Sequence, residues 1–300
     1  MSRKYFILGL FIGLGLLFAF FKTLPDGKLH LVFCNVGQGD ASYIRLPNNQ
    51  DILIDGGPDD KVLSCLGRHM PFYDRTIDMV FLSHPQADHL NGLVSVLERY
   101  SVKYYSSGPE GNTTAGYQKL KKLITDKNII VRNLYAGDRI GFGDVFITGI
   151  WPSREWIAGK LENNNLVEGN SNRVLGASTS YKEINDFSEV LLLTFGRFDA
   201  LFTGDADSHI QPEILNANPY LTSVKVLKTP HHGSRTGIFE AFLEKVKPSL
   251  AVISVGKNSY GHPSPEIIGR LKTIGSQILR TDQGADVEII SDGKDWWKKE

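Results

Sequence analysis

Several short apolar runs of this chain each end in a loop that carries histidine or aspartate. The runs cover residues 77–82, 198–203, 224–228 and 250–255, a length typical of buried strands. Polar ligand-type residues that arrive from separate strands are what a two-metal hydrolytic site requires. The pattern therefore predicts an α/β fold in which the chemistry lies in the loops that follow the strands.

The loop after the first of these runs carries His84, Asp88 and His89. Apolar residues at 90, 93, 94 and 97 have a helical period, so the loop joins a strand to a helix. Such a loop lets side chains converge on one point, which favours a metal site. The alternative is a polar loop in which Asp88 caps the helix and the histidines face solvent.

Asp205 follows a predicted hairpin formed by residues 190–195 and 198–203, with the turn at 196–197. A carboxylate at the end of a strand is well placed to bridge two cations, because both of its oxygens can bind. The alternative for Asp205 is an ordinary turn residue after glycine.

His231 and His232 follow the run at 224–228, and His262 follows the run at 250–255. Adjacent histidines point in different directions, so one of the pair is expected to bind metal and the other to contact a ligand or the substrate. A pair of surface histidines is the alternative. For His262 taken alone, a role in the site and an ordinary place in a loop are equally well supported.

Taken in order, these segments resemble the metallo-β-lactamase superfamily, in the branch that contains the hydrolase domain of the ComEC/Rec2 DNA-uptake proteins and its stand-alone relatives. The resemblance covers about residues 29–292 and implies an αββα sandwich of two mixed sheets flanked by helices. The matching segments are 35–40, 54–57, 83–89, 185–188, 203–205, 231–234 and 260–263.

The resemblance implies one or two divalent cations per chain, with zinc expected first and manganese as the alternative. Position 86, a histidine in the superfamily, is glutamine here, and the superfamily's middle histidine has no counterpart. The first metal site is therefore expected to be weak, whereas the second is intact. The implied metal ligands are His84, Asp88, His89, Asp205 and His232, with His232 chosen over His231.

By the same resemblance, Asp55 supports the metal loop rather than binding metal. Asp88, His231 and His262 are the candidate catalytic residues, the two histidines as proton donors to the leaving oxygen. The residues expected to support the ligands or to contact substrate are Asp55, Gln86, Asn185, Ser188 and Ser234.

The implied function is hydrolysis by a metal-activated water, with phosphodiester bonds as the preferred substrate class. The alternatives are a domain that binds metal or ligand without turnover, and a hydrolase of lactam or thioester substrates. The chain has 33 basic and 33 acidic residues, so no global field attracts a nucleic acid. Oligomeric state is open.

Residues 5–21 form an apolar run behind Arg3 and Lys4. The run predicts an uncleaved membrane anchor over residues 1–25, with residues 26–300 as one hydrolase domain outside the cytoplasm. A cleaved export signal, which would make the protein secreted, is the alternative.

Two further features are less specific. Cys34 and Cys65 lack metal-type spacing and are predicted to be small core residues, with a disulfide between them left open. Residues 153–180 are polar and aperiodic, which predicts a long surface loop, or alternatively a lid over the site.

Overall fold

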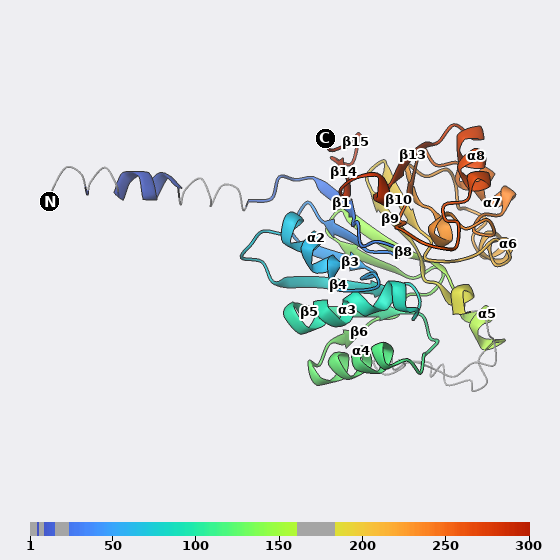
Figure 1. The fold of residues 1–300 in the computed structure, drawn as a ribbon, viewed down its shortest axis with the longest axis horizontal. Coiled ribbons are helices and arrows are strands. Elements are labelled where there is room, and N and C mark those ends of the chain that lie inside the picture. Colours follow the sequence, from blue (N-terminus) through green and yellow to red (C-terminus); the bar gives the residue numbers. More distant parts are fainter. Residues whose placement is uncertain (1–4, 6–8, 16–23, 161–183) are drawn as a thin grey trace.

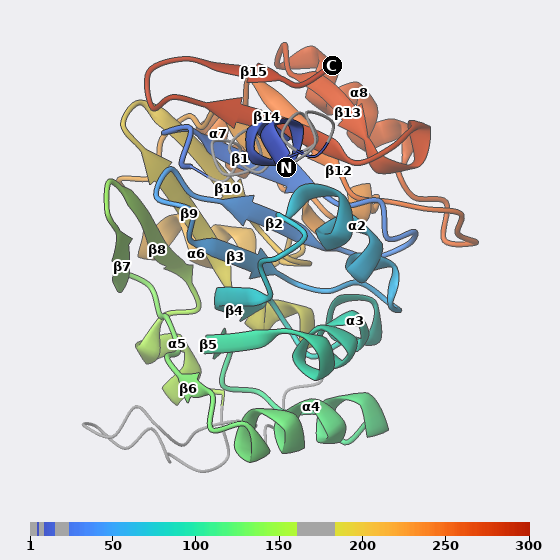
Figure 2. The same ribbon diagram turned by 90° about the vertical axis from the view of Figure 1, so that its left-hand side faces the viewer.

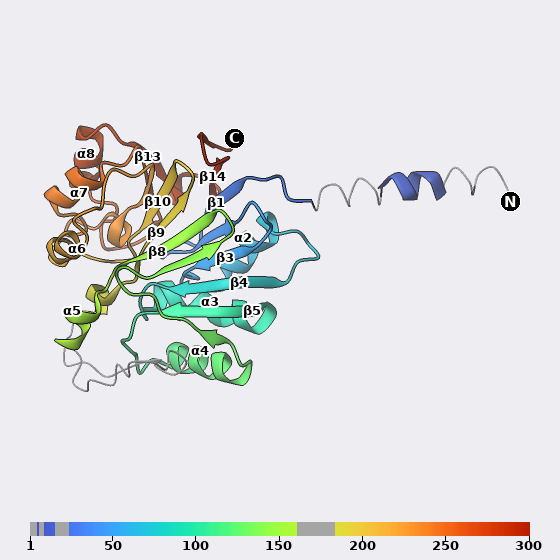
Figure 3. The same ribbon diagram turned by 180° about the vertical axis from the view of Figure 1, so that it is seen from behind.

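Two β-sheets pack against each other in this protein, and helices cover their outer faces (Figure 1). The computed structural model describes residues 5, 9–15, 24–160 and 184–300. Seen from behind (Figure 3), α2 to α4 and α6 to α8 lie on opposite sides of the strands. The predicted αββα sandwich is confirmed.

The first sheet has the order β15-β14-β1-β2-β3-β4-β5-β6, which can be followed from top to bottom in Figure 2. Its strands from β3 to β6 are parallel, and the other neighbours are antiparallel, so the sheet is mixed. The strands are β1 (Leu29–Phe33), β2 (Ser42–Arg45), β3 (Asp51–Ile54), β4 (Thr76–Leu82), β5 (Ser101–Ser107), β6 (Ile130–Val131), β14 (Val287–Ser291) and β15 (Trp296–Lys298).

The second sheet has the order β13-β12-β11-β10-β9-β8-β7. The strands β10 to β13 are parallel and β7 to β10 are antiparallel, and the predicted hairpin is the pair β9 and β10. The strands are β7 (Arg139–Phe142), β8 (Val145–Trp151), β9 (Val190–Phe195), β10 (Phe198–Phe202), β11 (Val226–Lys228), β12 (Leu250–Ile253) and β13 (Gln277–Arg280).

The main core lies between the sheets and consists of inward-facing aliphatic and aromatic side chains. Phe33 of β1 and Phe202 of β10 meet across it, with their ring centroids 6.1 Å apart. Each fully buried side chain of this kind stabilises the fold by about 1.5–3 kcal/mol. Because β1 and β10 each lead into a loop of the candidate site, this packing fixes those loops relative to each other.

Separate apolar clusters attach the helices to the outer faces of the sheets. Three 3₁₀ turns also occur in the described residues: η1 (Ile184–Phe187), η2 (Pro230–Gly233) and η3 (Thr281–Gln283). The helices are α2 (Lys61–His69), α3 (Ala87–Arg99), α4 (Ala115–Asp126), α5 (Arg154–Ala158), α6 (Gln211–Ala217), α7 (Glu240–Val246) and α8 (Pro265–Thr273).

Two local predictions differ from the structure. Helix α3 begins at Ala87, so Asp88 lies in its first turn and the N-cap position belongs to Gln86. Residues 154–158, predicted to be loop, form α5, because the Ser153 hydroxyl caps the helix by accepting a hydrogen bond from the Trp156 N–H at 3.1 Å. The remainder of the predicted loop, and its lid alternative, fall mostly in residues 161–183, outside the described ranges.

Cys34 and Cys65 are fully buried, as predicted for core residues, and they form a disulfide with a Cα–Cα distance of 5.8 Å. The bond joins the end of β1 to α2. It therefore anchors the segment that leads from β1 to Asp40.

Among the residues described, no helix is both long and apolar enough to cross a bilayer. The apolar run 5–21, predicted to be an anchor, includes residues 6–8 and 16–21, which are not described.

Candidate metal centre

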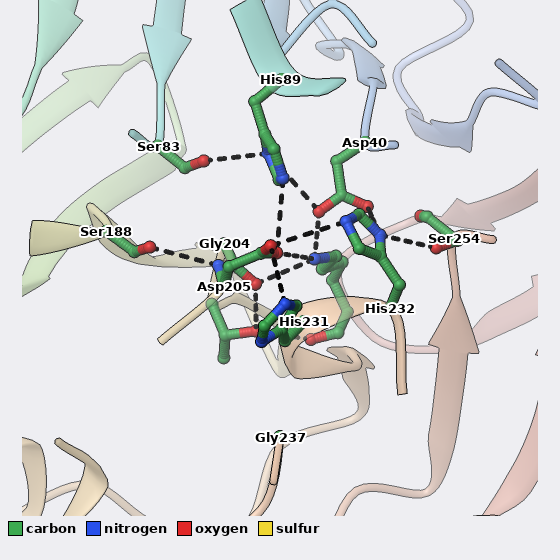
Figure 4. Close-up of polar contacts among 12 residues, drawn as sticks. Asp40, Ser83, His89, Ser188, Gly204, Asp205, His231, His232, Gly237 and Ser254 are labelled. Atoms are coloured by element: carbon green, nitrogen blue, oxygen red, sulfur yellow. Dashed lines mark hydrogen bonds and ion pairs between the residues drawn. The ribbon is translucent and has the colours of Figure 1, made fainter. Parts of the chain in front are cut away.

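Four loops from both sheets bring histidine and aspartate side chains to one buried point (Figure 4). Asp40 follows β1, His89 lies at the start of α3 after β4, Asp205 follows β10, and His232 follows β11. One ligand atom from each of the four lies within 4.8 Å of the others, and all four side chains are buried. Loops that follow strands of both sheets therefore gather at one point.

His89 is oriented by a carboxylate behind it. Its Nδ1 lies 2.9 Å from Asp55 Oδ2, which leaves Nε2 to face Asp205 Oδ1 at 3.3 Å. Asp55 also accepts hydrogen bonds from the Ser83 N–H at 2.7 Å and from the Ser83 hydroxyl at 2.8 Å. A carboxylate that binds the far ring nitrogen fixes the tautomer of a metal-binding histidine. The geometry of Asp55 is that of a support for the loop.

His232 is oriented by a backbone carbonyl. Its Nδ1 donates to the Ser254 carbonyl oxygen at 2.9 Å, so Nε2 is the nitrogen that faces the centre. That nitrogen lies 3.4 Å from Asp88 Oδ2 and 3.5 Å from Asp205 Oδ2. Burial lowers the pKa of His232, but the Asp205 and Asp40 carboxylates outweigh it and raise the value to about 10. The site therefore attracts positive charge strongly.

Asp205 lies between the histidines and is almost fully buried. Burial raises the pKa of its carboxyl group, but His232 and His89 hold it well below the usual value. Its N–H donates to the Ser188 hydroxyl at 3.2 Å. The preceding Gly204 has a φ of 49°, and an added Cβ would lie 2.8 Å from Ser83 Cβ, so the close approach requires glycine.

Asp40 and Lys228 belong to the centre although the sequence reasoning gave neither a role. Lys228, the last residue of β11, pairs with Asp40 and lies 3.7 Å from Asp205 Oδ1. Burial lowers the pKa of Lys228, but the two carboxylates raise it above the usual value. Two signals pointed to these residues: Asp40 ends the first segment of the resemblance, and Lys228 is a charge at the end of an apolar strand.

The donor set fits a divalent cation. Within the described residues, His89 Nε2, Asp205 Oδ1 and His232 Nε2 are buried and make no hydrogen bond. Buried polar atoms normally have partners, and imidazole nitrogens with carboxylate oxygens are the ligands that zinc and manganese take. The orphaned atoms converge as a cation would require.

The residues predicted for the first metal site are arranged differently. His84 is buried, and its ring centroid is 4.2 Å from that of His89, yet it is not one of the four residues whose ligand atoms converge. Burial, followed by His89, lowers the pKa of His84 to about 3, which keeps the ring neutral. Gln86 Nε2 donates to Asn185 Oδ1 at 2.5 Å. The side chains of Gln86 and Asn185 are therefore joined by a hydrogen bond.

His231 and His262 lie at the mouth of the centre, in a pocket of about 820 Å³ that Asp88 and His232 also line. His231 Nδ1 lies 2.9 Å from Asp207 Oδ1, and the His231 and His262 rings are 5.6 Å apart. Ser234, predicted to support a ligand or contact substrate, lies 3.2 Å from the Thr236 hydroxyl. His231 and His232 both have positive φ, a sparsely populated conformation for non-glycine residues that clusters at active sites.

Comparison with known proteins finds relatives that match most of this chain. The chain is 35% identical over 266 residues to competence protein ComA of Neisseria gonorrhoeae. The alignment covers 87% of this chain and 32% of ComA. The chain is 24% identical over 292 residues to ComE operon protein 3 of Bacillus subtilis, covering 91% of this chain and 34% of the relative. The chain thus spans about a third of these relatives. No protein-family model matches it.

Solved structures agree on the fold. The metallo-β-lactamase fold protein YhfI from Bacillus subtilis has a TM-score of 0.53 at 13% identity, covering 87% of this chain and 99% of that one. Igni18, a metallo hydrolase from Ignicoccus hospitalis, has a TM-score of 0.51 at 13% identity, with 87% and 98% covered. At such identities the likeness establishes the fold alone.

Proposed function

Because this chain is a ComEC/Rec2-like protein with the metallo-β-lactamase fold, we propose that it is a metal-dependent hydrolase that acts on phosphodiester bonds. The observation that carries the proposal is the buried group of imidazole and carboxylate atoms without hydrogen-bond partners, which opens into a pocket. Orphaned ligand atoms beside a cavity are typical of a catalytic metal centre rather than of a structural one, which is closed.

The residues that would hold the cation are His89, Asp205 and His232, whose ligand atoms converge. Asp88, which is not among the four converging residues but whose Oδ2 lies 3.4 Å from His232 Nε2, is proposed as the further ligand. When bound, such a cation lowers the pKa of water and polarises a phosphoryl oxygen. Asp55 and the Ser254 carbonyl hold the two histidine rings in place, so the ligand atoms are set before the cation arrives. Asp88 is the most exposed of the carboxylates here, at 32%, and it faces the pocket.

His231 is proposed as the proton donor to the leaving oxygen. Its Nδ1 is held by Asp207 at 2.9 Å, and its Nε2 lies 3.7 Å from Asp205 on the pocket side. A ring fixed through one nitrogen presents the other to the substrate, which is what general acid catalysis requires. His262, whose ring packs against that of His231, is the second candidate.

Phosphodiesters are proposed as the substrate class because relatives of the chain are named for competence and recombination. The neutral net charge gives no support to a nucleic acid, but Lys257 and Asn258 line the pocket and offer polar contacts to a phosphate. Lactam and thioester hydrolysis, or binding without turnover, remain the competing functions for the test.

The full-length chain, stripped of metal and reloaded with zinc or manganese, should be assayed against a phosphodiester, a β-lactam and a thioester. We expect turnover of the phosphodiester that depends on the cation and is lost in His89→Ala. Turnover of only the lactam or thioester would show that phosphodiesters are not the substrate class. A chain that binds metal and turns over nothing would be a binding domain.

We also propose that the domain lies outside the cytoplasm, anchored through residues 5–21. Arg3 and Lys4 precede that run, and the Cys34–Cys65 disulfide is of the kind that persists in oxidising compartments. Protease added to intact spheroplasts should digest the domain. Full protection of the domain would contradict this topology.

A further inference from the structure

Lys228 is an ammonium group buried inside the metal centre. Its side chain is 3% exposed at the end of β11. Lysine is almost never so buried unless it is paired, because removing an ammonium from water is costly. Its partners are the Asp40 carboxylate, the Gly204 carbonyl oxygen at 2.9 Å and Asp205 Oδ1 at 3.7 Å. The ammonium therefore lies among the atoms that would otherwise bind a cation.

The two oxygens of Asp205 face different groups. Oδ1 faces Lys228 and His89, whereas Oδ2 faces His232 at 3.5 Å and His231 at 3.7 Å. A carboxylate that bridges two cations would present one oxygen to each of them. Here one of the two positions next to the carboxylate is already taken by a positive charge.

Asp40 shows the same division. One oxygen, Oδ2, pairs with Lys228, and the other, Oδ1, lies 3.5 Å from His232 Nδ1. Although Asp40 has a ligand atom within reach of the other ligands, that carboxylate is engaged by the ammonium. Lys228 thus takes one of the two Asp40 oxygens that could otherwise coordinate a cation.

Lys228 also limits how much further positive charge the buried carboxylates can accept. Asp40 and Asp205 are buried and have ligand atoms that converge, and Lys228 already supplies one positive charge to both of them. A second divalent cation at these carboxylates would face the ammonium at a buried point, which is costly.

We propose that Lys228 takes the place of a second cation beside Asp205, so that the centre binds one divalent metal and the lysine ammonium supplies the other positive charge. This inference rests on the proposed metal binding but not on turnover. It makes Lys228 a positioning residue, since it acts through Asp40 and Asp205.

The test is calorimetric titration of the metal-stripped full-length chain with manganese and with zinc, for wild type, Lys228→Met and Lys228→Arg. We expect one cation per wild-type chain. Methionine keeps the length of the side chain and removes its charge. Lys228→Met should therefore bind a second cation, or bind the first with an affinity at least about tenfold higher, since a repelling charge is gone. Lys228→Arg should stay at one cation without a gain in affinity.

Lys225→Met is the matched control, because Lys225 is half-buried on the same segment and should leave the titration unchanged. Asp40→Asn combined with Lys228→Met should remove the gain, because the freed carboxylate is lost. Two cations in the wild type, or none, would overturn the inference even if no variant folded. A folded Lys228→Met chain with wild-type stoichiometry and affinity would overturn it as well.

The failure of the proposed function would look different. If the wild type binds one cation and Lys228→Met binds two, but neither hydrolyses any of the three substrate classes, the role of Lys228 stands and the hydrolase assignment fails.

Discussion

Within the described part of the chain, two clusters of histidine and carboxylate side chains can be compared, and one of them is arranged like a metal site. The metal centre leaves His89 Nε2 and His232 Nε2 without hydrogen bonds. The second cluster, here called the edge cluster, lies where α2 meets β1 and β14. Its members are His30, His69, Asp286 and Glu288.

Every ring nitrogen of the edge cluster has a partner. His30 lies between Glu288 at 2.8 Å and Asp26 at 2.9 Å, and His69 lies between Asp286 at 2.9 Å and Glu288 at 3.3 Å. The Sγ of Cys65 is also close to His69 and Asp286, but it is consumed by the disulfide. Residue types alone therefore do not make a metal site, because the ligand atoms must also be left unpaired.

The largest expected effect is the loss of metal when a ligand is removed. His89→Ala and Asp88→Ala should each weaken zinc or manganese binding more than about 100-fold, because losing a ligand costs more than the 10-fold to 100-fold typical of losing a supporting residue. Titration of the metal-stripped protein checks this, with circular dichroism to show that the domain stays folded.

His69→Ala is the matched control for these two variants. It removes an imidazole from the edge cluster, where no ligand atom is orphaned, so metal binding should not change. If Asp88→Ala and His89→Ala kept the metal content of the wild type, the centre would have been assigned to the wrong residues.

A smaller loss is expected from Asp55→Asn. Asp55 now accepts hydrogen bonds from Ser83 and His89. The asparagine amide would place an N–H group against one of these donors, so the His89 ring would lose its orientation. Metal affinity should fall about 10-fold to 100-fold. Asp59→Asn, a nearby aspartate that pairs with Lys61 at the surface, is the control. Equal titrations for Asp55→Asn and wild type would show that Asp55 does not act through His89.

Much of the fold could be predicted because its strands are short apolar runs with clear ends. The predicted strand 77–82 corresponds to β4, and the predicted hairpin corresponds to β9 and β10. Helix α5 was missed because five residues are too few to show a helical period, and its Ser153 cap lies in a polar stretch.

The site could be predicted only in part. His84, Asp88 and His89 are close in sequence, so their spacing is informative, whereas Lys228 becomes a site residue only when β11 lies beside β10. Its pairing with Asp40 spans two sheets, and no local pattern encodes such a contact. The disulfide was left open for the same reason, because 31 residues separate its cysteines.

A modest effect is expected from Gln86→His. The amide of Gln86 now donates to Asn185, and an imidazole at this position would add a ligand near His84. We expect weak binding of a second cation where the wild type binds one, limited because Lys228 stays beside Asp205 and the superfamily's middle histidine is still missing. Zinc and manganese titrations of the variant and wild type measure the gain. Two equally tight sites in the wild type, unchanged by the substitution, would contradict the weak first site.

The smallest effect is expected from His69→Gln, which should leave metal binding unchanged and alter only stability. Burial lowers the pKa of His69, but Asp286 and Glu288 raise it above 6.5. This contribution to stability is complete below pH 6.5 and is lost as the pH rises through the higher folded value. The pKa of Glu288 is lowered from 4.5, since its hydrogen bonds to His30, His69 and Lys299 outweigh burial, so its contribution is lost as the pH falls below that value.

The edge cluster should therefore stabilise the fold most between about pH 4.5 and pH 6.5. His69→Gln should lower the Tm by about 2–4 °C in that window, since a partly exposed pair contributes about 1 kcal/mol in a domain of this size. The difference from wild type should shrink as the pH rises through the raised pKa of His69. Thermal unfolding followed by circular dichroism at pH 5.5 and pH 9 measures it. A Tm difference that is the same at both pH values would mean that packing, and not the charged pair, is what His69 contributes.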